Sequence, residues 1–212
     1  GHGYSLSPDI MPIKVDKEYL KTPIIPFDAA EKAHIPVWIT EISDVTPLDT
    51  SIQDGLKWAV TFHNYLTKAN VNAIIWWGGA MPTSNNESLI ILNKNRKDYT
   101  LSKRYDILGN YSRYISEGST RIQVTQPKNK DLLVSAYKKN DKYILVAINL
   151  SEKTISTNIR LDGANIKGAL KQFTTNKDNR WNKTNIVPVT NQYYNLTIPQ
   201  FSIVTLVGKV HL

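Results

Sequence analysis

Two short apolar runs with an amphipathic segment between them constrain the fold more than any other feature of the sequence. The runs are residues 35–40 and 71–77, and the segment between them extends from a capping Thr50 or Ser51 to about residue 69. Its apolar positions fall mostly on one helical face. Short apolar runs are typical of strands buried in a parallel sheet, so we predict a β-α-β unit.

Two parallel strands cannot close a sheet by themselves. Around the β-α-β unit we predict helices at 27–34 and 101–115 and a polar loop at 80–98. This pattern indicates an α/β fold and fits a piece of a larger barrel better than a complete domain. The chain begins at Gly1 and not at Met, from which we expect a processed or truncated N-terminus.

The pattern changes after Gly118 to short runs with strand character, separated by turn signals such as Asp162-Gly163. Strands at this spacing predict an antiparallel β-sandwich. We therefore divide the chain into an α/β portion, residues 1–117, and an all-β portion, residues 118–212. The predicted strands are 121–125, 132–138, 143–149, 156–161, 169–174, 193–198 and 202–207.

The composition excludes several classes of function. The 212 residues contain no cysteine, which rules out disulfides and thiolate metal sites. The net charge is +8, but the basic residues are dispersed, which favours a solvated surface over a nucleic-acid site. The sequence has no metal-spaced cluster and no phosphate or dinucleotide loop, so we expect no cofactor. No stretch approaches the roughly 20 apolar residues of a membrane span.

Glu41 is the first candidate catalytic residue, because it directly follows a buried apolar run. Carboxylates at the carboxyl ends of barrel strands lie where such folds keep their active sites, and burying a charge without a role is costly. The alternative is a strand-end glutamate that simply faces solvent.

Trp76 and Trp77 end the next predicted strand. Aromatic faces bury the apolar faces of sugar rings, and alternation along a strand sends the two rings to opposite faces. We expect one indole in the core and the other in the site; the alternative is core packing of both. His2 and Tyr4 would end a preceding strand in the same way, unless they belong only to an ordered terminus.

Several segments, taken in order, resemble glycoside hydrolase family 30, and most closely its bacterial, glucuronoxylanase-like xylanase branch. They are Val-Trp-Ile-Thr-Glu at 37–41, Ile-Ile-Trp-Trp at 74–77, the segment 102–115, Gly-Ser-Thr-Arg-Ile at 118–122 and Phe-Ser-Ile-Val-Thr at 201–205. The resemblance implies the C-terminal part of a (β/α)8 TIM barrel, with its seventh and eighth strands, followed by a β-sandwich side domain.

The resemblance also implies roles for the candidate residues. Glu41 matches the nucleophile of retaining enzymes that cleave β-glycosidic bonds. Tyr4 would hydrogen-bond the nucleophile, His2 would line the site, and Trp76 or Trp77 would form the sugar platform. The acid/base glutamate belongs to the fourth barrel strand, which these residues do not include.

Retention requires two carboxyl groups about 5–5.5 Å apart. We therefore expect the isolated chain to be inactive until an N-terminal part of the same enzyme completes the barrel. The expected enzyme is a secreted bacterial endo-xylanase acting on β-1,4-xylan. The loop 78–86 lacks the arginine with which glucuronoxylan-specific members bind glucuronate, so we expect no strict dependence on that branch.

Two alternatives remain open at this point. One is a family-30 β-glycosidase of different specificity, similar to a glucosylceramidase. The other is a non-catalytic carbohydrate-binding protein that uses exposed aromatic side chains of the all-β portion, such as Trp181, Tyr193 and Tyr194.

Overall fold

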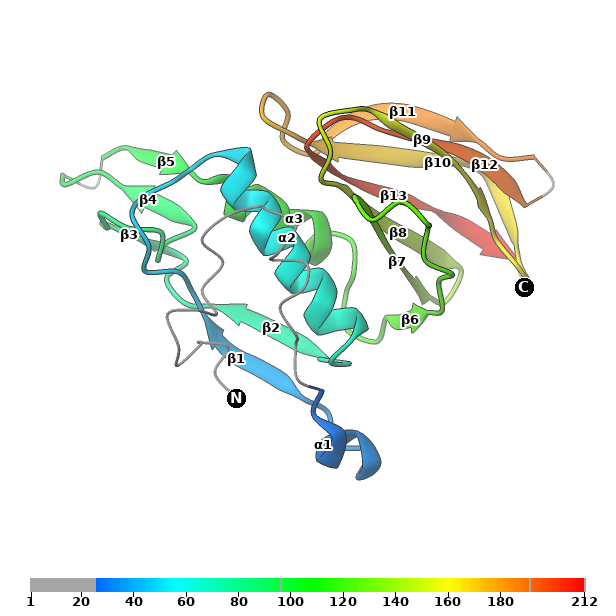
Figure 1. Ribbon diagram of the computed structural model, residues 1–212, viewed down its shortest axis with the longest axis horizontal. Helices are drawn as coiled ribbons and strands as arrows, with labels where there is room; N and C mark the ends of the chain where they lie inside the picture. The colour runs from blue at the N-terminus through cyan, green and yellow to red at the C-terminus, as the bar shows by residue number, and fades with distance from the viewer. Residues whose placement is uncertain (1–25, 96, 191, 212) are drawn as a thin grey trace. The chain divides into compact units, whose positions relative to one another are not determined.

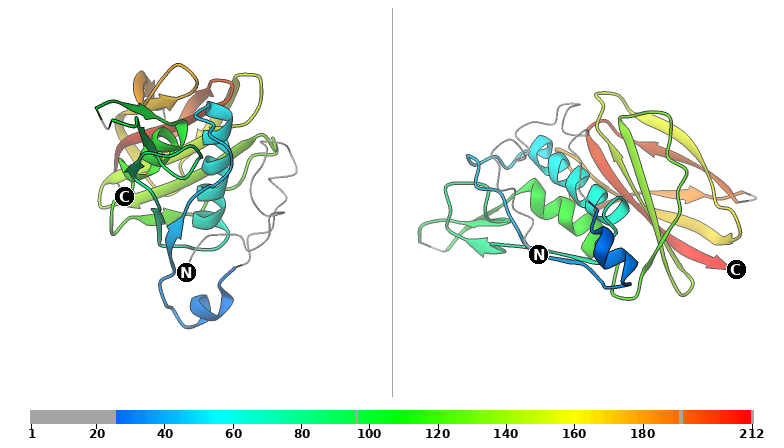
Figure 2. Two further views of the ribbon diagram at one scale, coloured as in Figure 1. Left: turned by 90° about the vertical axis from the view of Figure 1, so that its left-hand side faces the viewer. Right: turned by 60° about the horizontal axis from the view of Figure 1, so that its bottom comes forward.

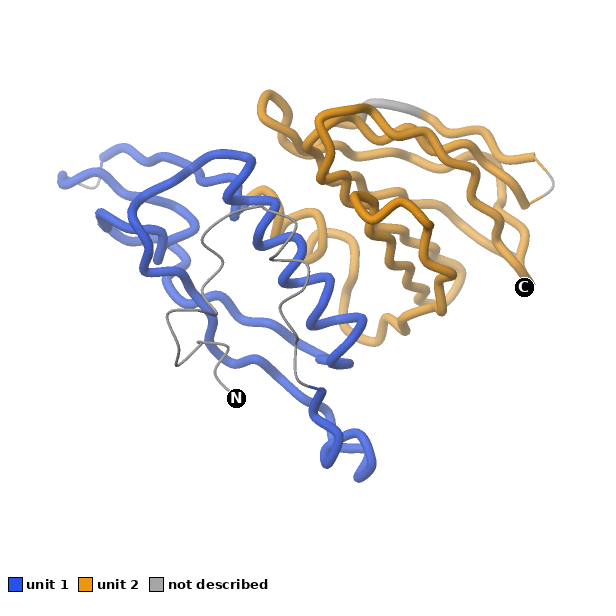
Figure 3. The backbone as a smooth tube through the Cα atoms, viewed as in Figure 1, with its two compact units in different colours: residues 1–105 blue, residues 106–212 orange. Residues whose placement is uncertain are grey.

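The computed structural model describes residues 26–211 apart from residues 96 and 191. The chain forms two compact units, residues 1–105 and 106–212, which Figure 3 colours separately. The division falls inside helix α3 (Lys103–Ser112).

The predicted β-α-β arrangement is present in the first unit. Strands β1 (Trp38–Ile42) and β2 (Ala73–Trp76) pair in parallel, and helix α2 (Ile52–Thr67) connects them. A short helix, α1 (Asp28–Lys32), precedes β1. The Ser51 side chain caps α2 by accepting a hydrogen bond from the Asp54 backbone N–H at 3.3 Å.

Helix α2 lies along one side of the β1–β2 sheet (Figures 1 and 2). Its Trp58 and Phe62 rings meet the Trp76 indole edge-on, with centroids 4.6 and 6.4 Å away. Ile39 and Ile42 contribute the buried side chains of β1. Edge-to-face aromatic contacts add about 0.5–1.5 kcal/mol to the burial of apolar area, so this cluster fixes the helix against the sheet.

Residues 80–101 contain a small three-stranded sheet where we predicted mainly a polar loop. Strand β3 (Ala80–Met81) pairs in parallel with β4 (Ile90–Leu92), which pairs antiparallel with β5 (Tyr99–Leu101). The loop prediction was wrong here because strands of two or three residues are too short to show a periodic pattern.

The second unit is mostly antiparallel β-structure. One sheet has six strands in the order β11-β10-β13-β8-β7-β6, and a second sheet pairs β12 with β9. The strands are β6 (Thr120–Ile122), β7 (Leu132–Lys139), β8 (Lys142–Asn149), β9 (Ile155–Arg160), β10 (Asn165–Thr175), β11 (Asn182–Pro188), β12 (Tyr193–Ile198) and β13 (Ser202–His211).

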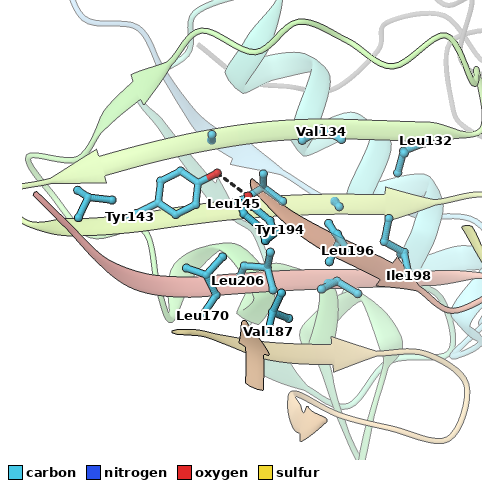
Figure 4. Close-up of a cluster of buried hydrophobic side chains, with 14 of the residues drawn as sticks. Leu132, Val134, Tyr143, Leu145, Leu170, Val187, Tyr194, Leu196, Ile198 and Leu206 are labelled. Carbon is cyan, nitrogen blue, oxygen red and sulfur yellow. Dashed lines mark hydrogen bonds between the residues drawn. The ribbon is translucent and has the colours of Figure 1, made fainter. Parts of the chain in front are cut away.

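One hydrophobic core joins the two sheets of the second unit (Figure 4). Alternate residues of β12 are buried in it, namely Tyr194, Leu196 and Ile198, while their neighbours face outward. The Tyr194 and Tyr143 hydroxyls hydrogen-bond each other at 2.8 Å inside the core. Burial raises the pKa of both hydroxyls above the ordinary value of 10, that of Tyr143 to about 12.

The expectation of a strand-rich C-terminal half is confirmed. Strand β11 was missed, because its sequence, Asn-Lys-Thr-Asn-Ile-Val-Pro, lacks an apolar alternation. It is an edge strand, paired only with β10. Polar residues and a terminal proline are tolerated at such edges, so a sequence pattern has little to detect.

Candidate active site

Glu41 is the penultimate residue of β1 and so lies at the carboxyl end of the strand, as we predicted. Between Ile39 and Ile42, β1 carries one residue more than the paired stretch of β2, which marks a β-bulge. In a regular strand Ile39 and Glu41 would share a face. Here Ile39 and Ile42 are both buried, while Glu41 is only half buried.

The bulge determines which side chains of β1 are buried and which can be reached from solvent. It allows Ile42 to join Ile39 in the core and leaves Glu41 outside the set of fully buried residues. Bulges re-aim side chains and are over-represented beside active sites. A half-buried carboxylate at the carboxyl end of a parallel strand is accessible to a ligand while its backbone is held by the sheet.

The two tryptophans divide as the alternation predicts. Trp76 is 8% exposed and packs in the core beneath α2, whereas Trp77 is 47% exposed. The Trp77 backbone N–H donates to the carbonyl of Ile42 at 2.9 Å. Because Ile42 directly follows Glu41, the backbones that carry the carboxylate and the exposed indole are adjacent at one edge of the sheet.

Glu87, which the sequence did not single out, contacts both tryptophans. Its backbone carbonyl accepts a hydrogen bond from Trp76 Nε1–H at 2.9 Å, and its carboxylate Oε1 accepts one from Trp77 Nε1–H at 3.0 Å. It follows Trp77 by ten residues and lies in the turn between β3 and β4. Only the sequence Asn-Asn-Glu-Ser in a loop after a predicted site strand could have pointed to it.

A buried polar network joins the starts of helices α2 and α3 to the loops that follow the two strands. Arg104 is fully buried and forms an ion pair with Asp54, which is also fully buried. Arg104 also donates to the backbone carbonyls of Asp49 at 2.6 Å and Ser88 at 3.3 Å. Desolvation raises the pKa of Asp54 to about 6, and the adjacent Arg104 charge opposes this shift.

Asn86 joins the same network to the loop after β1. Its side-chain N–H groups donate to Thr46 Oγ1 at 3.0 Å and to Asp44 Oδ2 at 3.3 Å, and its Oδ1 accepts the Asp49 backbone N–H at 2.6 Å. Asp44 and Asp49 also accept the backbone N–H groups two residues ahead of them, as loop and capping residues do. Asp54 differs from them, because it forms the buried ion pair.

The remaining predicted site residues fall elsewhere. His2 and Tyr4 lie outside the described residues. In the second unit, Tyr194 is 3% exposed and Trp181 is half buried, its Nε1–H donating to the Asp106 carbonyl at 2.6 Å. The expectation that both are exposed binding residues was therefore wrong for Tyr194 and does not fit Trp181. Tyr193 is exposed, as expected.

Two structural features bear on other ligand classes. In residues 26–211, leaving aside 96 and 191, no group of three or more His, Asp and Glu side chains could hold a metal ion. No helix in the described part of the chain is long and apolar enough to cross a membrane.

A carboxylate and an exposed indole thus lie at the carboxyl edge of a parallel β-α-β unit, and a strand-rich second unit follows it. Comparison with known proteins finds relatives among xylanases. The chain is 26% identical over 180 residues to glucuronoxylanase XynC of Bacillus subtilis (strain 168), covering 81% of this chain and 39% of that protein. No protein-family profile matches the chain.

Solved structures show the same fold. The chain superposes on the glycoside hydrolase family 30 subfamily 8 xylanase Xyn30A of Clostridium acetobutylicum with a TM-score of 0.76 and 23% identity, over 89% of this chain and 46% of that one. For a family 30 endoxylanase of Clostridium papyrosolvens C71 the TM-score is 0.72, with 23% identity and coverages of 87% and 45%.

The resemblance to family 30 xylanases that the sequence indicated is thus confirmed. The chain spans about two-fifths, 39%, of the length of the curated relatives it matches.

Proposed function

We propose that this chain is the part of a retaining glycoside hydrolase that carries the catalytic nucleophile, Glu41, and that the enzyme cleaves β-1,4-xylan internally. The observation that carries the proposal is the bulge in β1, which leaves Glu41 half buried beside the exposed Trp77. In barrel enzymes the catalytic groups gather at this carboxyl edge of the strands. Xylan as the substrate follows from the relatives, which are xylanases.

In this mechanism the Glu41 carboxylate attacks the anomeric carbon and forms a glycosyl-enzyme intermediate. A second, protonated carboxyl group protonates the leaving oxygen and then activates the water that releases the sugar. The Trp77 indole would lie against the apolar face of a sugar ring at the cleavage site. His2 and Tyr4 remain proposed binding residues on the grounds of the resemblance alone.

We further propose that an N-terminal part of the same enzyme completes a (β/α)8 barrel and supplies the acid/base. Large apolar side chains of the β1–β2 sheet are only partly covered: Trp38 is 54% exposed and Ile75 48%. Parallel sheets occur almost only with both faces covered. The chain spans only 39% of the length of the relative, which leaves room for further strands.

On this proposal, residues 1–117 are the C-terminal portion of the barrel, and the antiparallel unit is its β-sandwich side domain. Its two sheets share a single core, as the layers of a sandwich do. We also propose that the enzyme is secreted and acts outside the bacterial cell, since its polymeric substrate is extracellular.

The proposal is tested with Glu41→Gln in the full-length enzyme, which preserves the shape of the side chain but not its nucleophilicity. We expect xylan turnover to fall by about 10⁴-fold or more while xylan binding persists. Glu152→Gln, at an exposed position of the second unit, is the control and should keep full activity. Retention of turnover by Glu41→Gln would leave a carbohydrate-binding role as the better explanation.

A further inference from the structure

Glu87 is anchored through its backbone, and its side chain meets the N–H edge of the exposed Trp77 indole. Its backbone carbonyl binds the Trp76 indole N–H, and its carboxylate binds the Trp77 indole N–H. Its own backbone N–H donates to Asn85 Oδ1 at 3.0 Å. Two hydrogen bonds thus anchor the Glu87 backbone, and a third joins its carboxylate to the edge of the indole.

Gly78 makes this arrangement possible. It has a φ of +78°, and a Cβ atom at this position would lie 2.7 Å from the Glu87 carbonyl oxygen. The chain continues alongside, where the backbone N–H of Leu89 donates to the Gly78 carbonyl at 3.0 Å. Only glycine permits this close approach with a left-handed backbone, so the loop is built around the contact between Glu87 and the tryptophans.

The Glu87 carboxylate can accept further hydrogen bonds besides the one from Trp77. An ionised carboxylate offers two oxygens with about four acceptor sites, and Trp77 uses one of them. Glu87 is half buried, so it can be reached from solvent. A sugar ring lying on the indole would present hydroxyl donors at the ring's edge, where a neighbouring carboxylate can accept them.

The loop that carries Glu87 has a negative charge and no positive charge in its sequence. From Gly78 to Ile90, Glu87 is the only ionisable residue, and the stretch contains no Lys or Arg. The side chain that reaches the exposed indole is therefore an anion with no cation in its own loop. A neutral sugar meets a strong acceptor there, while a sugar that bears a carboxylate meets like charge.

We infer that Glu87 is a positioning residue for the Trp77 platform and a specificity-determining residue that favours neutral xylan units over glucuronate-bearing ones at this subsite. The inference rests on the proposed function and gives it a substrate class. The hydrogen bond fixes the tilt of the indole, and the carboxylate charge disfavours an acidic branch.

Two variants of the full-length enzyme separate these roles. Glu87→Gln keeps an acceptor for the indole and removes the charge, whereas Glu87→Ala removes both. The readout is kcat/KM on a linear xylo-oligosaccharide and on the same oligosaccharide with one glucuronate branch. For Glu87→Gln we expect the preference for the neutral substrate to fall about fivefold or more at low salt. For Glu87→Ala we expect KM for the neutral substrate to rise about tenfold, with rescue in the Gln variant.

Ionic strength gives an internal control. The preference of the wild-type enzyme should shrink as salt increases, whereas that of Glu87→Gln should not change. A preference that is the same in wild type and Glu87→Gln at every salt concentration would overturn the specificity role.

A spectroscopic measurement tests the positioning role without turnover. The 212-residue chain contains five tryptophans and thus gives up to five indole N–H signals in a ¹⁵N-labelled sample. Trp77→Phe assigns one of them. We expect this signal to move upfield in Glu87→Ala and to stay close to its wild-type position in Glu87→Gln. An unchanged signal in Glu87→Ala would overturn the positioning role, whereas absence of turnover in the wild-type full-length enzyme would instead count against the proposed function.

Discussion

The two units differ in how they bury their apolar surface. The second unit encloses a core in which Leu170, Leu196 and Leu206 are fully buried between two antiparallel sheets. The first unit covers only part of its parallel sheet and leaves Trp38, Ile75 and Trp77 about half exposed. It also holds a buried ion pair between Arg104 and Asp54. The second unit therefore buries its large apolar side chains between its own two sheets, whereas the first leaves several open to solvent, as the proposed barrel would require.

The largest effect on stability should come from the buried ion pair of the first unit. Arg104→Met leaves the Asp54 carboxylate without its counter-charge, and breaking a buried pair in this way typically costs about 3–5 kcal/mol. We expect the free energy of unfolding of the first unit, measured by urea denaturation, to fall by that amount. The double variant Arg104→Met/Asp54→Leu should recover most of the loss. A shift below about 1 kcal/mol in the single variant would show that the pair does not hold these loops together.

A core truncation in the second unit should have a similar or slightly smaller effect. Leu206→Ala removes a fully buried side chain shared by both sheets, which costs about 2–5 kcal/mol. We expect the cost to appear in the thermal transition of the second unit, measured by calorimetry. If Leu206→Ala lowered both transitions equally, the separation into two compact units would be wrong.

The raised pKa of Asp54 predicts a pH dependence of the first unit. Its value of about 6 in the folded state exceeds the ordinary 3.8, so the folded state binds the proton more tightly than the unfolded state. Stability from this group is therefore greatest below pH 4 and decreases as the pH rises through 6, by at most about 3 kcal/mol. Asp54→Asn should flatten the dependence between pH 4 and 6, and an unchanged slope in that variant would assign it to another group.

The smallest effect should come from the open face of the β1–β2 sheet. In the isolated chain Ile75→Ser changes a half-exposed side chain, and we expect a change within about 0.5 kcal/mol. In the full-length enzyme the same substitution should cost about 1.5–3 kcal/mol, because the completed barrel buries the side chain. Equal costs in both would mean that no further strands cover this face.

The sequence predicted the regular parts of the fold well. The β-α-β unit and the strands with strong apolar alternation, such as β12, follow from local pattern, because period and burial coincide in them. Strand β11 and the short strands β3 and β4 depend on neighbours supplied by the fold. The bulge at Glu41 results from a mismatch in pairing with β2, which one strand alone cannot reveal.

In the candidate site, too, some residues follow from local sequence pattern and others depend on contacts made only in the fold. Glu41 and Trp77 could be predicted because each stands at the end of an apolar run. Glu87 could not, because its importance comes from two indole hydrogen bonds across a loop. Arg104 and Asp54 are 50 residues apart and meet only in the folded unit.

The most direct test of the account is to trap the covalent intermediate on Glu41. The full-length enzyme would be treated with a 2-deoxy-2-fluoro xylobioside that has an activated leaving group, digested, and analysed by mass spectrometry. The account predicts a fluoroglycosyl adduct on the peptide that contains Glu41 and no adduct in Glu41→Gln. An adduct on another carboxylate, such as Glu87, or persistent labelling of the Glu41→Gln enzyme, would contradict it.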